Sequence, residues 1–202
     1  MKRLIAAFAV IVALACMTSS AKAGNTFDYC LLCHGSNANG NYGIRAPKLS
    51  GVEPWYLARQ LENFAAGIRG APVDDAAGHE MAPVAWRLKQ EGTLDDAVKF
   101  ISSLDSKRPH ATVQGNATTG KKLYEACSAC HGARGEGNAA LQSPALAARS
   151  DWYLATQLTN YKTGLRGADD RDSFGAQMRA IASTLPDDKA IADLVSYIAT
   201  LK

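Results

Sequence analysis

The sequence predicts an all-α protein built from two copies of one small helical domain. Three observations support this fold class: the two halves match at a constant offset of 97 residues, apolar residues recur at helical spacing, and strand-like alternation is absent. A chain of 202 residues has room for two domains of ordinary small size.

The duplication needs no gap anywhere along its length. The matched pairs, first half before second, are CLLCH at 30–34 with CSACH at 127–131, WYLARQLENF at 55–64 with WYLATQLTNY at 152–161, GIRG at 67–70 with GLRG at 164–167, and Met81 with Met178. Because the offset never changes, a role inferred for a residue in one half can be tested against its equivalent in the other.

Each copy is predicted to contain two amphipathic helices. The apolar faces are Leu57, Leu61, Phe64 and Ile68 over 54–69, Leu94, Val98, Ile101 and Leu104 over 93–104, Leu154, Leu158, Tyr161 and Leu165 in the second copy, and Ile191, Leu194, Ile198 and Leu201 over 186–201. Pro54 suits the first turn of its helix, and Gly70 can end it. Glycine-containing loops are expected at 35–53 and 132–149.

Residues 1–23 have the layout of a secretory signal peptide. Lys2 and Arg3 precede an apolar run of 13 residues, and the segment ends in an A-x-A sequence, so cleavage is expected before Gly24. A retained anchor is a weaker alternative, since a bilayer-spanning helix needs about 20 apolar residues. Lipid attachment at Cys16 is a further alternative, disfavoured because Ala13 stands where such signals usually carry Leu.

Removal of that segment takes away three basic residues and no acidic one, which leaves 19 of each and no net charge. This balance argues against nucleic-acid binding, which normally shows a basic excess. Residues 105–119 are polar and lack apolar periodicity. We therefore expect a first domain at 24–106, a linker at 107–115 and a second domain at 116–202.

The mature chain has four cysteines, and all of them lie in two C-x-x-C-H motifs. Two disulfides would be the default for an exported protein, but C-x-x-C-H is the attachment signature of a c-type haem. In such a motif, the two thiols of one helical segment bond to the two vinyl groups of the haem. The adjacent His binds the haem iron. A zinc site would need further paired Cys or His ligands, and each half has only one such cluster. A thioredoxin-like redox pair would need a βαβ context, which is missing. The predicted attachment residues are Cys30, Cys33, Cys127 and Cys130, with His34 and His131 as iron ligands.

The stretch GHEMAPVA at 78–85 offers two candidates for the second iron ligand, His79 and Met81. Met81 and Met178 are the two methionines of the mature chain, and each lies 47 residues after its own C-x-x-C-H histidine. His79 has Ala176 as its equivalent. Since Met and His are the usual axial pair of cytochromes c, the methionines are the predicted ligands. The stretch is interpreted as a loop that carries Met81.

With these motifs, the mature chain resembles the dihaem cytochrome c4 family over essentially its whole length. The resemblance implies two tandem class I cytochrome c domains, each a small helical bundle around one covalently bound haem c. It also implies proximal ligands at His34 and His131 and distal ligands at Met81 and Met178. The carbonyls of Pro47 and Pro144 would accept a hydrogen bond from the proximal histidine of their domain.

The resemblance further implies a periplasmic electron-transfer protein that is not an enzyme and passes single electrons toward a terminal oxidase. The implied partners are redox proteins, namely a terminal oxidase, other cytochromes or a dehydrogenase, and peripheral association with the membrane is compatible with this role. The alternative is a cytochrome subunit of an enzyme complex, such as a flavocytochrome c sulfide dehydrogenase or a quinoprotein dehydrogenase. A dihaem peroxidase or thiosulfate-oxidising enzyme is a more distant alternative. Such an enzyme needs one iron with an open coordination position, a weak ligand or a Cys ligand.

The mature protein is expected to contain two covalently attached haems, because each C-x-x-C-H motif supplies one complete attachment site. A haemochrome assay combined with intact mass measures the haem count directly. A count of one or none would refute the interpretation of the motifs.

Overall fold

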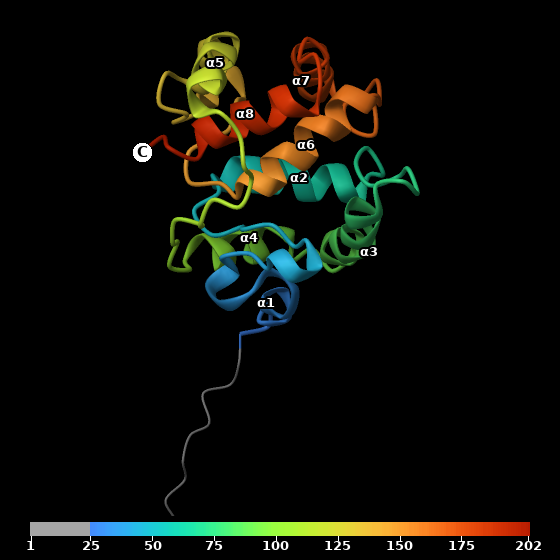
Figure 1. Ribbon diagram of the computed structural model, residues 1–202. Coiled ribbons are helices and arrows are strands. Elements are labelled where there is room, and N and C mark those ends of the chain that lie inside the picture. The colour runs from blue at the N-terminus through green and yellow to red at the C-terminus, as the bar shows by residue number, and fades with distance from the viewer. Residues whose placement is uncertain (1–24) are drawn as a thin grey trace, which may run out of the picture.

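The computed structural model describes residues 25–202 and is helical throughout, as the sequence predicts (Figure 1). Apart from two isolated bridges, the described residues form no strand. The predicted signal peptide, residues 1–23, lies outside the described residues. Between residues 25 and 202, no helix has both the length and the apolarity needed to cross a bilayer.

The first half contains four α-helices and two short 3-10 turns. Their bounds are α1 Tyr29–His34, η1 Ser36–Ala38, η2 Tyr42–Ile44, α2 Pro54–Ala65, α3 Ala76–Gln90 and α4 Leu94–Ser102. The two turns lie in the segment that was expected to be a loop. They let a long connection stay compact between the C-x-x-C-H motif and α2.

The second half repeats the order of the four α-helices, with one 3-10 turn in place of two. Its elements are α5 Ala117–His131, η3 Ala139–Leu141, α6 Asp151–Thr163, α7 Ser173–Ala182 and α8 Asp188–Ile198. The helix that carries the C-x-x-C-H motif has 15 residues here and six in the first half. This difference follows from the longer polar lead-in before Cys127, whose N-cap Asn116 accepts hydrogen bonds from the N–H groups of Thr118 and Thr119.

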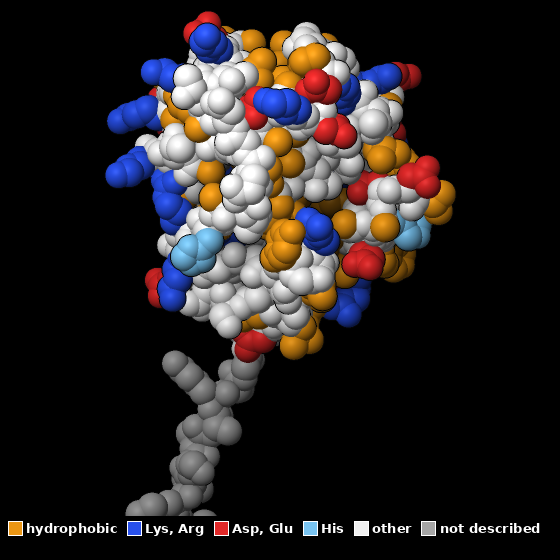
Figure 2. Space-filling model, viewed as in Figure 1, with side chains coloured by type: hydrophobic (Ala, Val, Ile, Leu, Met, Phe, Trp, Pro, Cys, Tyr) orange, Lys and Arg blue, Asp and Glu red, His pale blue; other side chains and the backbone are white. Residues whose placement is uncertain are grey.

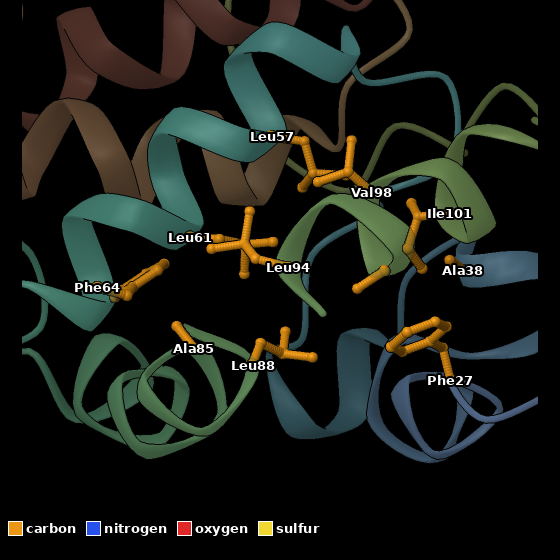
Figure 3. Close-up of a cluster of buried hydrophobic side chains, with 11 residues drawn as sticks. Phe27, Ala38, Leu57, Leu61, Phe64, Ala85, Leu88, Leu94, Val98 and Ile101 are labelled. Atoms are coloured by element: carbon orange, nitrogen blue, oxygen red, sulfur yellow. The ribbon is translucent and has the colours of Figure 1, made fainter. Parts of the chain in front are cut away.

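Each half has its own apolar core. In the first half, Leu57 and Leu61 of α2 point toward Leu94 and Val98 of α4, and Leu88 of α3 closes the cluster from below (Figure 3). In the second half, α5 and α6 pack on α8, and the most deeply buried residues are on α8. The predicted apolar faces therefore point inward, and burial of each such side chain stabilises the fold by roughly 1.5–3 kcal/mol.

The prediction of a loop at 78–85 was wrong, because this stretch lies inside α3. Gly78 and Pro83 are unfavourable inside a helix, but Asp75 caps this one by accepting a hydrogen bond from Gly78 N–H at 3.2 Å. Ala85 and Leu88 are also buried in the core. Capping and burial together outweigh the loss of one hydrogen bond at Pro83.

The helix predicted over 54–69 ends earlier than expected, at Ala65. Gly67 has a φ of +67°, and the N–H groups of Ile68 and Arg69 both turn back to the carbonyl of Asn63. A glycine in this left-handed conformation ends the helix before Gly70 is reached.

Gly70 instead fixes the position of α3. It has a φ of +75°, and a Cβ atom at this position would lie 2.3 Å from the carbonyl oxygen of Gly78. Gly167 repeats the contact in the second half, where its Cβ would lie 2.3 Å from the oxygen of Gly175. Two glycines in each half thus let the start of the methionine-bearing helix approach the turn that follows α2 or α6.

The two halves meet where α2 and α6 lie side by side (Figure 1). An arginine in the turn after each of these helices donates to a tyrosine on the helix of the other half. The segment between α4 and α5 is irregular but held at both ends. Lys107 N–H donates to Asn39 of the first half, and Asp151 of the second half accepts from the N–H groups of Thr112 and Val113. These contacts fix how the halves face each other.

We expect Gly70→Ala to lower the free energy of unfolding, because alanine meets both the left-handed backbone and the carbonyl of Gly78. Gly92→Ala is the matched control, since Gly92 has a φ of +68° and no atom near its Cβ position. Urea denaturation should show a loss at least about 1 kcal/mol larger for Gly70→Ala. Equal losses would show that the close contact does not constrain α3.

Candidate functional site

His34 is the last residue of α1, and its imidazole is buried. Its Nδ1 lies 2.7 Å from the carbonyl oxygen of Pro47. A carbonyl can only accept, so Nδ1 carries the proton and Nε2 keeps its lone pair. Burial lowers the pKa of His34, which favours the neutral imidazole that a metal requires.

His131 has the same environment at the end of α5. Its Nδ1 donates to the carbonyl oxygen of Pro144 at 2.7 Å, and burial lowers its pKa. In both halves the hydrogen bond fixes the ring orientation and leaves Nε2 available as a ligand. The carbonyls of Pro47 and Pro144 thus each lie within hydrogen-bond distance of the histidine 13 residues earlier.

The four cysteines are free thiols in the described structure, so the two-disulfide alternative has no support there. Cys30 and Cys33 lie three residues apart on α1, and Cys127 and Cys130 have the same spacing on α5. This spacing puts both thiols of a pair on one side of the helix, next to the histidine. Burial raises the pKa of the Cys30 and Cys127 thiols.

Met81 and Met178 come from α3 and α7, and both line a large cavity. His79 is exposed on the other side of α3 and does not line it. The His79 ring nitrogen Nδ1 lies 3.3 Å from the carbonyl oxygen of Gly70. The structure therefore brings Met81, and not His79, toward the same space as His34.

The cavity is continuous between the two halves and has a volume of about 870 Å³. Both candidate donor sets reach it, His34 with Met81 from one side and His131 with Met178 from the other. Most of its wall is apolar. A volume of this size suits large organic ligands, for which binding cavities commonly measure about 300–1,000 Å³.

Several buried polar atoms of residues on the wall have no hydrogen-bond partner within the described residues. They are Arg69 Nε, Arg149 Nη1, Arg166 Nε and Glu53 Oε2. Unpartnered donors are costly unless a ligand accepts from them. The cavity offers an apolar wall, two imidazole nitrogens, two thioethers, the thiols of Cys127 and Cys130, and three buried cationic donors. These groups fit haem c, which has an apolar macrocycle, an iron centre and acidic side chains.

Sequence reasoning missed the polar residues at the centre of the contact between the halves. Gln60 with Gln157 and Arg69 with Arg166 are equivalent pairs that line the cavity. Their signal was present, since the glutamine and the arginine both recur at the 97-residue offset within segments that otherwise vary. Helical spacing alone does not reveal which polar residues of a helix are buried, so no role was predicted for these four residues.

Residues 117–202 match the family model described as Cytochrome c. Cytochrome c4 of Azotobacter vinelandii is 32% identical over 84% of this chain and 82% of its own length. The chain belongs to the cytochrome c4 family. It is thus an electron-transfer protein, not an enzyme, with two helical cytochrome domains and covalently bound haem c.

Two further comparisons add to this assignment. The crystal structure of reduced recombinant cytochrome c4 from Pseudomonas stutzeri is similar with a TM-score of 0.66 and 29% identity, over 86% of this chain and 94% of that one. A protein of Stutzerimonas stutzeri named thiosulfate dehydrogenase electron acceptor is 29% identical over 85% of this chain and 78% of its own length.

Met81→Ala is expected to remove the sulfur-to-iron absorption band of one haem and to lower the reduction potential of that haem, because loss of the thioether favours Fe(III). Met178→Ala should do the same at the other haem. His79→Ala is the matched control on α3 and should leave both bands intact. Loss of a band in the His79 variant, with the helical circular dichroism unchanged, would contradict the assignment of Met81.

Proposed function

We propose that this cytochrome is a periplasmic dihaem carrier that receives single electrons from a dehydrogenase and passes them toward a terminal oxidase. The observation that carries the proposal is the presence of two complete donor sets on the wall of one cavity. The proposed domains are residues 24–106 and 116–202, each with one haem c, joined by residues 107–115.

Each half would hold its haem by the same means. The thiols of Cys30 with Cys33, and of Cys127 with Cys130, would form the thioether bonds. His34 and His131 would bind iron from the proximal side and Met81 and Met178 from the distal side. The hydrogen bonds to the carbonyls of Pro47 and Pro144 keep the imidazoles oriented and raise their basicity as ligands.

Filled axial positions are the reason to propose a carrier. Haem c supplies an Fe(III)/Fe(II) couple when bound. With His34 and Met81 on opposite sides, and the equivalent pair in the other half, the chain would leave no coordination position for a substrate. The mostly apolar wall disfavours water in the same space. What the protein controls is then the reduction potential and the approach of redox partners.

The charge distribution favours docking of redox partners by electrostatic steering. Residues 24–106 have a net charge of −3 and residues 107–202 a net charge of +3, with histidines neutral. Lys and Arg side chains line the edge of the molecule beside α5 (Figure 2), where Lys121 and Lys122 are exposed. Oppositely charged ends can attract different partners and raise their association rates.

The second candidate is a dedicated electron-accepting subunit of a dehydrogenase complex. The name of the Stutzerimonas stutzeri relative, thiosulfate dehydrogenase electron acceptor, favours it. The chemistry of the two sites would be unchanged, and the difference would lie in a permanent partner. Such a partner would need a larger and more apolar interface than the small contacts of transient redox encounters.

Purification from the native cells, followed by mixing with membranes that contain a terminal oxidase, tests the carrier function. We expect a single chain with two haems whose ascorbate-reduced form is reoxidised by the membranes in a cyanide-sensitive reaction. Stoichiometric co-purification with a flavin- or quinone-containing subunit would favour the second candidate. Rapid peroxide turnover by the isolated protein would contradict both.

A further inference from the structure

Arg69 bridges the two halves of the molecule. Its side chain is 7% exposed. Nη1 donates to Oε1 of Gln60 in the same half at 2.9 Å, while Nη2 donates to Tyr153 Oη at 2.9 Å and to Gln157 Oε1 at 3.0 Å in the other half. One guanidinium group is therefore shared by both domains.

Arg166 makes the equivalent contacts in the opposite direction. It is 5% exposed, and its Nη1 donates to Oε1 of Gln157 at 2.7 Å. Its Nη2 donates across to Tyr56 Oη at 2.9 Å and Gln60 Oε1 at 2.7 Å. The two arginines thus share both glutamine oxygens, which holds two positive charges close together.

The partners of these arginines are neutral. Among the described residues, neither arginine forms an ion pair with a carboxylate. Asp75 and Asp172 line the same cavity, but each accepts a hydrogen bond at the start of its own helix, α3 or α7. Two buried like charges without a counter-ion repel each other and are costly to desolvate.

Each of these guanidinium groups also has an N–H donor without an acceptor. The Nε atoms of Arg69 and Arg166 are buried without a hydrogen-bond partner, and both residues line the cavity. Other charged groups on the wall have their own partners: Glu53 lies 3.6 Å from Arg149, Lys48 donates to the carbonyl of Ser50, and Arg59 donates to Gln142. The arginine pair therefore contributes two buried positive charges to the wall without a carboxylate partner.

We propose that Arg69, Arg166, Gln60, Gln157, Tyr56 and Tyr153 form an interdomain clamp that binds carboxylate side chains of the haems, and that each arginine of the clamp raises the reduction potential of both haems. This inference rests on the proposed function, because it requires one haem in each half. The haem propionates supply the missing negative charge, and the guanidinium donors suit carboxylates.

The cross-domain effect follows from the position of the charges. A positive charge disfavours Fe(III) relative to Fe(II), because oxidation adds a positive charge nearby. Each guanidinium is hydrogen-bonded to side chains of both domains and lies away from water, where screening is weak. Removal of either arginine therefore lowers both reduction potentials. An arginine that binds the propionates of one haem alone would change the potential of that haem only.

The test uses Arg69→Gln and Arg166→Gln in the full mature protein, in which each change removes one charge. NMR signals of the two oxidised haems, assigned with the Met81 and Met178 variants, report each potential separately during a redox titration. We expect both potentials to fall in each variant. Lys99→Gln removes an exposed charge from the first half and should leave both potentials unchanged.

Two milder variants guard against loss of folding. Arg69→Lys keeps the charge and should restore most of both potentials, and Tyr153→Phe removes one acceptor of Arg69 while the charge remains. A fall confined to the haem of the substituted half, or no fall in a folded variant with two haems, would overturn the clamp. A haem count below two in the unmodified protein would instead refute the proposed function.

Discussion

The arrangement of the molecule depends on hydrogen bonds that α2 and α6 accept from the arginines in the turns after them. Gln60 and Gln157 each accept from an arginine of their own half and from one of the other half. These bonds are directional, unlike apolar packing, so they fix the angle between the halves as well as their contact. They also bring the two candidate donor sets to a single cavity.

Within each half, two local contacts position a histidine and a methionine that lie 47 residues apart in sequence. The short motif helix ends in a buried histidine whose ring is held by a proline carbonyl 13 residues later. The methionine arrives on a helix whose start touches the glycine turn after α2 or α6. Both contacts recur in the second half, so the two sites are built in the same way.

Much of the fold could be predicted from the sequence, because its signals are local. The apolar faces of α2 and α4 follow from residues three and four apart, and the histidine sites follow from contiguous motifs. Two features required tertiary information. The α3 helix depends on the Asp75 cap and on burial of Leu88, which outweigh Pro83. The buried role of Arg69 depends on partners in the other half, 84 and 88 residues away.

The central claim is that each half holds one iron between a histidine and a methionine. Diffraction from crystals of the mature protein, recorded at the iron absorption edge, tests it most directly. The account predicts two anomalous peaks, one between His34 Nε2 and Met81 Sδ and the other between His131 Nε2 and Met178 Sδ. A single peak, or a peak ligated by His79 in place of Met81, would contradict it.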